Sequence, residues 1–522
     1  MVSVPFFRQL SAVSLASLFL PSSASPASCY NNTPSPSILP PRVTLDNGLI
    51  VDGVINPSTP GVSEYLGIPY AKPPVADLRW APPQSYSPEN GTIINATSIP
   101  ASCYQYSTDN PTLLTKELPD FVVGSAGNAG LSEDCLTVSV YAPANAVKNG
   151  SSLPVVIWVY GGGFATGAMD VKYQIPSKWI ERSQVHIVVT FNYRINIFGY
   201  PNAAGLEEQN LGILDQRLAI EWTQSNIAKF GGNPSQMVLW GHSAGSVAVD
   251  YYNFAYPSDP IVKGLIMNSG TVHLDQLVSP DTPHSNFTFV ASNVGCANQT
   301  NAAAELACMR NVPADVIEDF LHAYEDSGVS PSITFAPTVD DVIVFGNYTE
   351  RTALGALSTL PAIIGNTANE GMFLAPYVST GSDQSIATQI SYEYFWCPST
   401  KSSYERLAAN RTTHRFLYSG NFTNVSPKPW IGAYHSSELP SVFATHDLNG
   451  ESGEFEVAVS EKMQDAWLAF AKDLDGGLEA LGWEAYEGRG GAVMEFAGED
   501  GSVGTIVELG EIEEECAAQG LA

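Results

Sequence analysis

The chain contains a serine framed by small residues, in the stretch LWGHSAGSVA at positions 239–248. GHSAG matches the G-x-S-x-G pattern, in which a sharp turn from a strand into a helix lifts the serine hydroxyl clear of the backbone. The pattern alone is a weak signal, but its context fits, because an apolar run precedes it and a segment with helical character follows it. Ser243 is therefore predicted to be a nucleophile that attacks carbonyl groups.

Three consecutive glycines, in VYGGGFATG at 159–167, could stabilise the anion that such an attack creates. Glycines leave backbone N–H groups unobstructed, and the residue after the nucleophile, Ala244, would add a further donor. The alternatives are a flexible turn and a phosphate-binding loop. Because no Gly-Lys-Ser/Thr sequence follows the glycines and no basic cluster is near, the phosphate loop is disfavoured.

The serine also needs a base, and the chain offers eight histidines. His242 is adjacent to the serine, but neighbouring side chains diverge at a sharp turn, so it is poorly placed to accept the proton. His435, in the loop WIGAYHSSELPSVF (430–443), and Glu370, in GNTANEGMF (365–373), complete the chain order serine, acid, histidine. The other histidines have no catalytic partner in sequence: His186, expected in the core, and His273, His284, His322, His414 and His446.

Short apolar runs rich in β-branched residues recur along the chain and predict strands. Because they are apolar on both faces, they suit the interior of a mostly parallel sheet covered by helices. LGILDQRLAIEWTQSNIAKFGG (211–232) is expected to form one crossover helix that ends at its glycine pair. The fold class is therefore α/β, and one domain over 42–522 is predicted because no repeat or long linker interrupts it. The predicted strands are 136–143, 154–162, 186–194, 236–243, 264–270, 361–366 and 415–420.

The composition of the chain limits its partners. Its 522 residues are 44% hydrophobic, enough for a large core, and carry 53 acidic against 23 basic residues, a formal net charge of -30. Such a field repels phosphate backbones and anionic lipid surfaces, so nucleic acid is not expected as a partner. The acidic run at 511–515 is interpreted as a solvated surface or frayed tail.

The N-terminus has the pattern of a secretory signal. Arg8 is followed by the apolar stretch LSAVSLASLFL and then by small residues, which predicts a signal peptide over 1–24 and a Ser/Pro-rich arm over 25–41. The rival interpretation, an uncleaved membrane anchor, is disfavoured because no stop-transfer flank follows. No later run approaches 18 apolar residues, so a secreted, extracellular protein without a stable membrane anchor is expected.

Two further features fit the secretory route. Seven cysteines lie beyond the signal and most should pair in an oxidising compartment, with at least one left over. Sequons for N-glycosylation are frequent, which suggests a glycoprotein. They occur at Asn31, Asn90, Asn95, Asn149, Asn286, Asn298, Asn347, Asn410, Asn421 and Asn424.

With these motifs in order, the sequence resembles the type-B carboxylesterase/lipase family of α/β-hydrolases, which includes cholinesterases and fungal lipases. The resemblance covers nearly the whole chain from about residue 43. It is carried by the blocks YLGIPYAKPPVADLRWAPPQ (65–84), EDCLTVSVYAP (133–143), VVIWVYGGGFATG (155–167), FNYRINIFGY (191–200), NLGILDQRLAIEWTQSNIAKFGGNP (210–234), the GHSAG turn, APTVDD (336–341), GNTANEG (365–371) and YHSSELPSVF (434–443).

The resemblance implies roles for individual residues. Ser243 would be the nucleophile, His435 the general base and then acid, and Glu370 the carboxylate that sets the imidazole tautomer. Gly162, Gly163 and Ala244 would form the oxyanion hole, and Ser269 would hydrogen-bond the acid. The remaining implied pairs are structural: Arg79 with Glu133, Arg194 with Asp215, and disulfides Cys103–Cys135 and Cys296–Cys308. Cys29, Cys397 and Cys516 have no assigned partner.

Three departures from the family pattern bear on the substrate. His242 stands where the family usually has Glu, and the segment between Cys103 and Cys135 contains no Trp of the kind that stacks on choline. The interval from Glu370 to His435 is also shorter than usual. His242 and Phe164 are expected to line the substrate pocket, and His242 is expected to become partly cationic below about pH 6.5.

The leading hypothesis is a secreted serine carboxylesterase that acts through an acyl-enzyme on neutral or acidic rather than choline esters. A lipase for long-chain acylglycerols and an acyltransferase of secondary metabolism remain alternatives, and a non-catalytic binding ectodomain is disfavoured because the motifs are intact. No cofactor or metal is expected, and the oligomeric state stays open. TLLTKELPDFVV (112–123) could form a lid, although covering the core is the favoured interpretation.

Overall fold

The structure is a computed structural model that describes residues 40–122, 124, 129–147 and 149–521. The expected signal peptide, most of the expected arm and Cys29 lie outside the described residues. By its contacts the chain forms one unit from Pro40 onward. None of the helices within the described ranges is long and apolar enough to cross a membrane.

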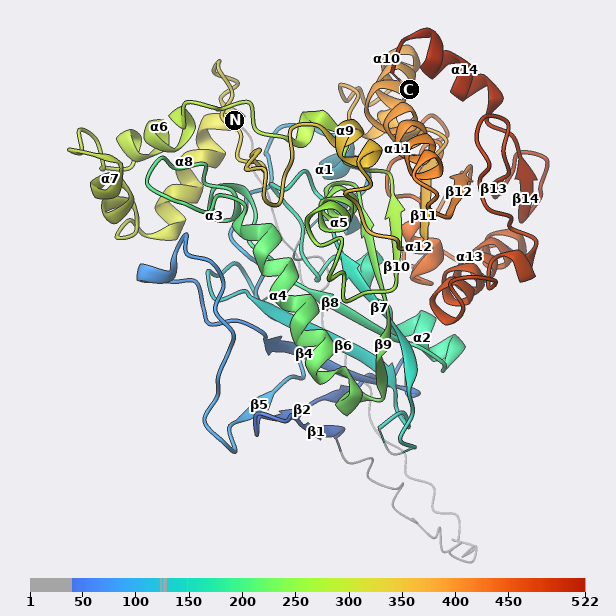
Figure 1. Cartoon of the computed structure of the whole chain (residues 1–522), viewed down its shortest axis with the longest axis horizontal. Coiled ribbons are helices and arrows are strands. Elements are labelled where there is room, and N and C mark those ends of the chain that lie inside the picture. The colour runs from blue at the N-terminus through green and yellow to red at the C-terminus, as the bar shows by residue number, and fades with distance from the viewer. Residues whose placement is uncertain (1–39, 123, 125–128, 148, 522) are drawn as a thin grey trace, which may run out of the picture. The chain divides into compact units, whose positions relative to one another are not determined.

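Eleven strands form one large sheet in the order β14-β13-β12-β11-β10-β9-β7-β8-β6-β4-β3 (Figure 1). Seven neighbouring strands, β8, β7, β9, β10, β11, β12 and β13 in sheet order, run parallel to one another. At one edge β6, β4 and β3 join antiparallel, and at the other edge β14 does. The predicted α/β class with a mostly parallel sheet is confirmed. The strands are β3 Val54–Ile55, β4 Val62–Pro69, β6 Thr137–Pro143, β7 Leu153–Val159, β8 Ile187–Phe191, β9 Gly232–His242, β10 Gly264–Asn268, β11 Ala362–Thr367, β12 Thr413–Tyr418, β13 Val493–Phe496 and β14 Gly504–Val507.

All seven predicted apolar runs contain strands of this sheet, and most of their residues are buried, on both faces of the sheet. A smaller sheet at the N-terminal side of the described chain joins β1 (Arg42–Thr44), β2 (Ile50–Asp52) and β5 (Ile93–Asn95). The expected crossover helix is α4 (Leu211–Asn226), continued by a 3₁₀ turn. It ends at Gly231 with φ +90°, the left-handed conformation in which glycine stops helices.

The helices cover the sheet in two layers. Along β9 successive side chains alternate between faces, so Trp240 points away from its neighbours Leu239 and Gly241. The Trp240 ring meets Trp179 and Trp467, which belong to α2 and α13. Gly241 instead faces the first turn of α5, which lies with α4 in front of the strands in Figure 1.

The helices are α1 Leu113–Glu117, α2 Ser177–Ser183, α3 Asn196–Gly199, α4 Leu211–Asn226, α5 Ala244–Ala255, α6 Ser285–Asn293, α7 Ala302–Met309, α8 Ala314–Asp326, α9 Tyr348–Ala353, α10 Gln384–Ile390, α11 Cys397–Ala408, α12 Leu439–Val442, α13 Glu454–Lys472 and α14 Gly510–Ala518. Helices α6, α7 and α8 pack beside α3 around a separate apolar cluster that includes Phe198, Phe287 and Ile317. They form the yellow-green group at one side of Figure 1.

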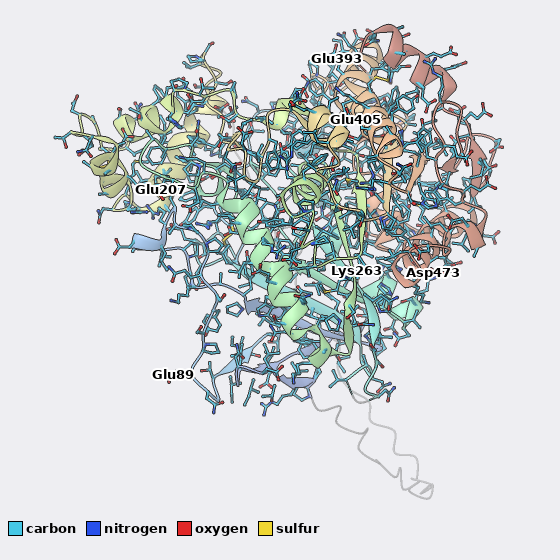
Figure 2. All side chains as sticks on the ribbon, in the orientation of Figure 1. Glu89, Glu207, Lys263, Glu393, Glu405 and Asp473 are labelled. Carbon is cyan, nitrogen blue, oxygen red and sulfur yellow. A yellow bond between two sulfur atoms is a disulfide. The ribbon has the colours of Figure 1, made fainter. Side chains whose placement is uncertain are left out.

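Disulfides and buried ion pairs tie the loops to this framework. Both expected disulfides are present, Cys103–Cys135 and Cys296–Cys308, and a third joins Cys397 to Cys516 and so anchors α14 beside α11. The expected ion pairs are present as well, with Nε of Arg79 2.6 Å from Glu133 and Nη2 of Arg194 2.7 Å from Asp215. Many of the excess carboxylates are solvated at the surface, as for Glu89, Glu207 and Asp473 in Figure 2.

Candidate active site

Ser243 lies at the turn between β9 and α5, as its motif predicts. Its backbone has φ 55° and ψ -126°, a strained conformation for a residue with a side chain, and its N–H donates to Asn268 O at 2.9 Å. The small residues of the motif are required by close packing. A Cβ on Gly245 would lie 2.2 Å from Val159 O, and one on Gly241 would lie 2.3 Å from Gly245 O. The turn can therefore form only with glycine on both sides of the serine.

The acid and the histidine come together from loops that follow two neighbouring strands. Nδ1 of His435 lies 2.6 Å from Oε2 of Glu370, which is fully buried in the turn after β11. The loop that follows β12 carries His435, and Asn369 N donates to Ala433 O at 2.8 Å, so the two segments are also joined by their backbones. Because Nδ1 faces the carboxylate, the imidazole is held with Nε2 free to exchange a proton.

Glu370 is held by partners of its own. Ser269 Oγ donates to Oε1 at 2.6 Å and the amide of Thr367 donates to the same oxygen at 2.8 Å. The position of Ser269 is thus the one that the resemblance implies. With Oε1 bound by these two donors and by Nδ2 of Asn366 at 3.3 Å, and Oε2 bound by His435, the carboxylate cannot rotate without losing hydrogen bonds.

Three rings enclose the imidazole of His435. The ring centroids of His242, Phe395 and Phe373 lie 4.5, 4.6 and 5.2 Å from its own. Phe395 belongs to a π-helical turn, Ser391–Trp396, that joins α10 to α11, and such turns are frequent at functional sites. Neither Phe395 nor Phe373 was singled out by sequence, where each is one aromatic residue among many.

The glycine loop lies directly beside the serine. A Cβ on Gly161 would lie 2.8 Å from Cβ of Ser243. Gly162, with φ 119°, accepts at its carbonyl from the amides of Ala165 and Thr166, and this turn directs the loop. Within the described ranges the amides of Gly162 and Gly163 have no acceptor, and Ala244, the first residue of α5, has none within its helix. All three N–H groups are therefore available to an oxyanion.

The two residues expected to line the pocket lie deeper than expected. Phe164 is fully buried, with its ring centroid 5.2 Å from that of Tyr200 and 6.4 Å from that of Tyr251, so its side chain packs in the core. His242 is 4% exposed. Burial, together with the neighbouring His435, lowers the pKa of His242 well below 6.5. The prediction that His242 becomes partly cationic below about pH 6.5 is therefore wrong.

Sequence reasoning also missed a buried carboxyl group next to the histidine. Glu438 has no exposed surface, and burial, followed by repulsion from Glu370, raises its pKa to about 8. Its Oε1 accepts from Asn268 Nδ2 at 3.0 Å and lies 4.0 Å from Nε2 of His242. In the sequence Glu438 is marked only by its position three residues after His435. That spacing does not show that the carboxyl group is buried beside the histidine.

The possible lid segment packs onto the loop that carries the histidine. Thr112 and Thr115 cap the short helix α1 reciprocally, and Leu113 and Leu118 are buried. The ring of Phe121 lies 4.4 Å from that of Tyr173 and 5.9 Å from that of Tyr434, next to His435. In this conformation Leu113, Leu118 and Phe121 pack in one apolar cluster and cover the interior.

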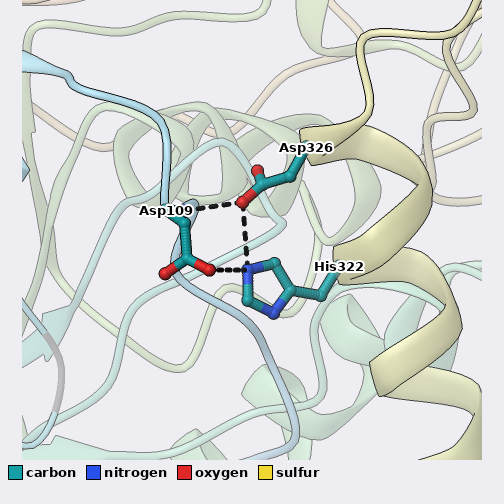
Figure 3. A group of neighbouring side chains, drawn as sticks. All are labelled: Asp109, His322 and Asp326. Atoms are coloured by element: carbon teal, nitrogen blue, oxygen red, sulfur yellow. Dashed lines mark hydrogen bonds and ion pairs between the residues drawn. The ribbon is translucent and has the colours of Figure 1, made fainter.

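In the described part of the chain, one group has the spacing of metal ligands, outside the site built around Ser243 (Figure 3). Asp326 and His322 of α8 point toward Asp109 of the loop after Cys103. Nε2 of His322 lies 3.1 Å from Asp326 and 3.8 Å from Asp109, and the amide of Asp109 donates to Asp326 at 2.7 Å. The side chain of Asp109 is 91% exposed, and the hydrogen bonds and ion pairs within the group account for the geometry of the three residues. We therefore assign the group the role of anchoring the loop of Asp109 on α8.

A mostly parallel sheet with a strained serine turn after a central strand, and with an acid and a histidine after later strands, defines an α/β-hydrolase. A family model described as "Carboxylesterase family" matches residues 40–394, and the chain belongs to this family. It is 41% identical over 500 residues to a chlorogenic acid esterase of Aspergillus niger, covering 91% of this chain and 95% of the relative. It is 38% identical over 496 residues to secreted lipase 5 of Gibberella zeae (89% and 91%), and 31% identical over 344 residues to the acetylcholinesterase of Electrophorus electricus (65% and 52%).

Proposed function

We propose that this carboxylesterase-family enzyme hydrolyses esters through an acyl-enzyme formed on Ser243. The hydrogen bond between His435 Nδ1 and the buried Glu370 carries the proposal, because it leaves Nε2 as the base. The serine oxygen attacks the ester carbonyl carbon while its proton passes to Nε2. The resulting oxyanion accepts hydrogen bonds from the amides of Gly162, Gly163 and Ala244.

Collapse of this tetrahedral intermediate breaks the bond to the alcohol, which leaves with the proton held by His435. Water then attacks the acyl-enzyme, gives its proton to the same imidazole and releases the acid as the serine recovers its hydrogen. If another alcohol replaces water, the product is a new ester, so the acyltransferase alternative uses the same residues. Product analysis in the presence of a competing alcohol separates the two, since free acid dominates for a hydrolase.

The substrate we propose is a neutral or acidic ester rather than a choline ester. His242, the residue before the serine, is a neutral imidazole where the family usually has a carboxylate. A cationic substrate therefore gains no charge attraction from this position. Two relatives of similar identity carry the names chlorogenic acid esterase and secreted lipase, so an aromatic-acid ester and an acylglycerol are the substrates to compare first. The name of the second relative, secreted lipase 5, together with the N-terminal signal pattern, supports a secreted enzyme.

The decisive experiment combines Ser243→Ala with a fluorophosphonate probe. Wild type should turn over a short p-nitrophenyl ester and be labelled at Ser243, whereas the alanine variant should show neither activity nor labelling. Ser246→Ala, in the first turn of the helix that follows Ser243 but with its hydroxyl bonded to Gly270 O, is a matched control for folding. Undiminished turnover by the Ser243 variant would overturn the proposal. Chlorogenic acid, an acylglycerol emulsion and acetylthiocholine then define the preference, for which we expect no useful turnover of the choline ester.

A further inference from the structure

His242 occupies the space between the segment that carries the nucleophile and the segment that carries the base. It is the last residue of β9 and directly precedes Ser243. Its ring centroid is 4.5 Å from that of His435, and its Nε2 lies 3.3 Å from the hydroxyl of Ser436, the residue after the base. One side chain thus contacts the base and its loop while its backbone adjoins the nucleophile.

Glu438, in the same loop as Ser436, lies close to this contact. Its Oε1 lies 4.0 Å from His242 Nε2 and accepts from Asn268 Nδ2 at 3.0 Å. The side-chain oxygen of Asn268 in turn accepts from Nε1 of Trp240 at 3.1 Å, two residues before His242. Hydrogen bonds therefore link β9 through Asn268 of β10 to the base loop at Glu438, whose Oε1 lies near the His242 ring at the end of β9 without a hydrogen bond to it.

The base loop needs such support because its backbone is strained. Ser436 has φ 88°, an unfavourable value for a residue with a side chain, and such a conformation persists only where surrounding contacts impose it. Ser436 and His242 are both less than a tenth exposed. Solvent therefore cannot replace the hydrogen bond between them without opening the loop.

We infer that His242, through its contacts with Ser436 and His435 and with Glu438 beside it, is a positioning residue that holds the loop of His435 in register with Ser243. The inference rests on the proposed function, in which Ser243 attacks and His435 carries the proton. Catalysis of this kind is sensitive to distance, since a displacement of about 1 Å at the reacting groups can cost on the order of 100-fold in rate. His242 thus has a role of its own in positioning the base, in addition to replacing the glutamate that the family usually has at this position.

The neutral charge of His242 and Glu438 is a second reason to expect that these residues suit a position beside the base. When His435 takes the proton it becomes cationic beside Glu370, and a cationic His242 at 4.5 Å would oppose that step. Burial keeps His242 neutral, and burial raises the pKa of Glu438 to about 8, so both groups are uncharged at neutral pH. The titratable groups facing the pair are Glu370 and His435, with Tyr418 of β12 and Tyr434 near Glu438.

The experiment compares polar and apolar replacements at both positions. His242→Leu should lower kcat for a p-nitrophenyl ester by about 10- to 100-fold, with KM within about twofold, because the loop shifts without removal of a substrate contact. In His242→Gln the side-chain amide can still hydrogen-bond to Ser436. The decrease in log kcat relative to wild type should therefore be at most half of that in His242→Leu. Glu438→Gln, neutral like the buried acid, should similarly retain far more activity at pH 6.5 than Glu438→Leu. His186→Leu removes a similarly buried imidazole directly before β8 and controls for lost packing, with kcat expected within about twofold.

A purely structural role predicts a different result. If His242→Leu and His186→Leu lower the melting temperature alike and both keep the wild-type kcat, the inference is overturned while the proposed function stands. Equal losses in His242→Leu and His242→Gln also overturn it, because the hydrogen bond would then be irrelevant. If Ser243→Ala remains active, the proposed function itself has failed, which is a separate outcome.

Discussion

Nδ1 of His435 lies 2.6 Å from Oε2 of Glu370, although 65 residues of chain separate them. This contact follows from strand order. Because β11 and β12 are parallel neighbours, the segments that follow them leave the sheet at the same edge. The backbone bond from Asn369 to Ala433 then brings the acid and the base into line. The pair is a property of the sheet and not of either loop alone.

Replacing Glu370 by Gln tests this relationship. The amide can donate to Nδ1 and so stabilise the tautomer in which Nε2 carries the hydrogen and cannot accept the serine proton. We expect kcat to fall by on the order of 10⁴-fold with little change in thermal stability, since the packing is preserved. Steady-state kinetics on a p-nitrophenyl ester measures the loss. A decrease of less than tenfold would show that the carboxylate does not set the tautomer.

Gly162 and Gly163 should respond differently to the same substitution. A Cβ on Gly162 would lie 2.3 Å from Thr166 O, whereas one on Gly163 meets nothing within 4 Å. Gly162→Ala must therefore displace the loop and its amides, and a lost oxyanion donor costs about 10²- to 10³-fold in kcat. Gly163→Ala strains only the local backbone, at about 1–2 kcal/mol, and should lose much less activity. Similar kcat values for the two variants would contradict the assignment of these amides.

The sequence predicted the parts of the site that depend on short continuous motifs. The turn at Ser243, the glycine loop and the order of acid and histidine are each readable from a few adjacent residues, and the family resemblance added Ser269 and two disulfides. The sequence did not predict what depends on burial or on distant contacts. Glu438 and Phe395 become relevant only when their segments fold against His435, and the charge of His242 depends on its 4% exposure. The Cys397–Cys516 bond, which joins elements far apart in the chain, was likewise unassigned.

That third disulfide should contribute more stability than the Cys296–Cys308 bond. It closes a loop with a sequence separation of 119 residues, against 12 for the other, and the chain-entropy model assigns these loops about 5 and about 3 kcal/mol. Serine at both Cys397 and Cys516 should therefore lower the free energy of unfolding by about 2 kcal/mol more than serine at both Cys296 and Cys308. Equilibrium denaturation in guanidinium measures both. The reverse order would mean that α14 stays docked without its bond.

Two neighbouring sequons should differ in glycosylation if the chain is secreted. The Nδ2 atom of Asn424, to which a glycan would be linked, donates to His446 O at 2.6 Å and to Ser452 and Glu456 at 3.0 Å. A glycan there would remove these bonds, whereas Asn421 is exposed. Mass spectrometry of peptides after enzymatic deglycosylation should find Asn421 modified and Asn424 unmodified. A fully occupied Asn424 in active enzyme would contradict this packing.

Glu318, on α8 and away from the candidate site, should make stability depend on pH. Burial raises its pKa from 4.5 to about 8, so between these values the folded chain holds a proton that the unfolded chain has lost. The free energy of unfolding should therefore decrease as pH rises from 5 to 8, by up to about 1.4 kcal/mol per pH unit from this group. Glu318→Gln cannot ionise and should flatten the slope, while Asp315→Asn, at an exposed position on the same helix, should leave it unchanged. Urea denaturation at several pH values measures these slopes, and identical slopes for wild type and Glu318→Gln would mean that Glu318 is ionised in the folded protein.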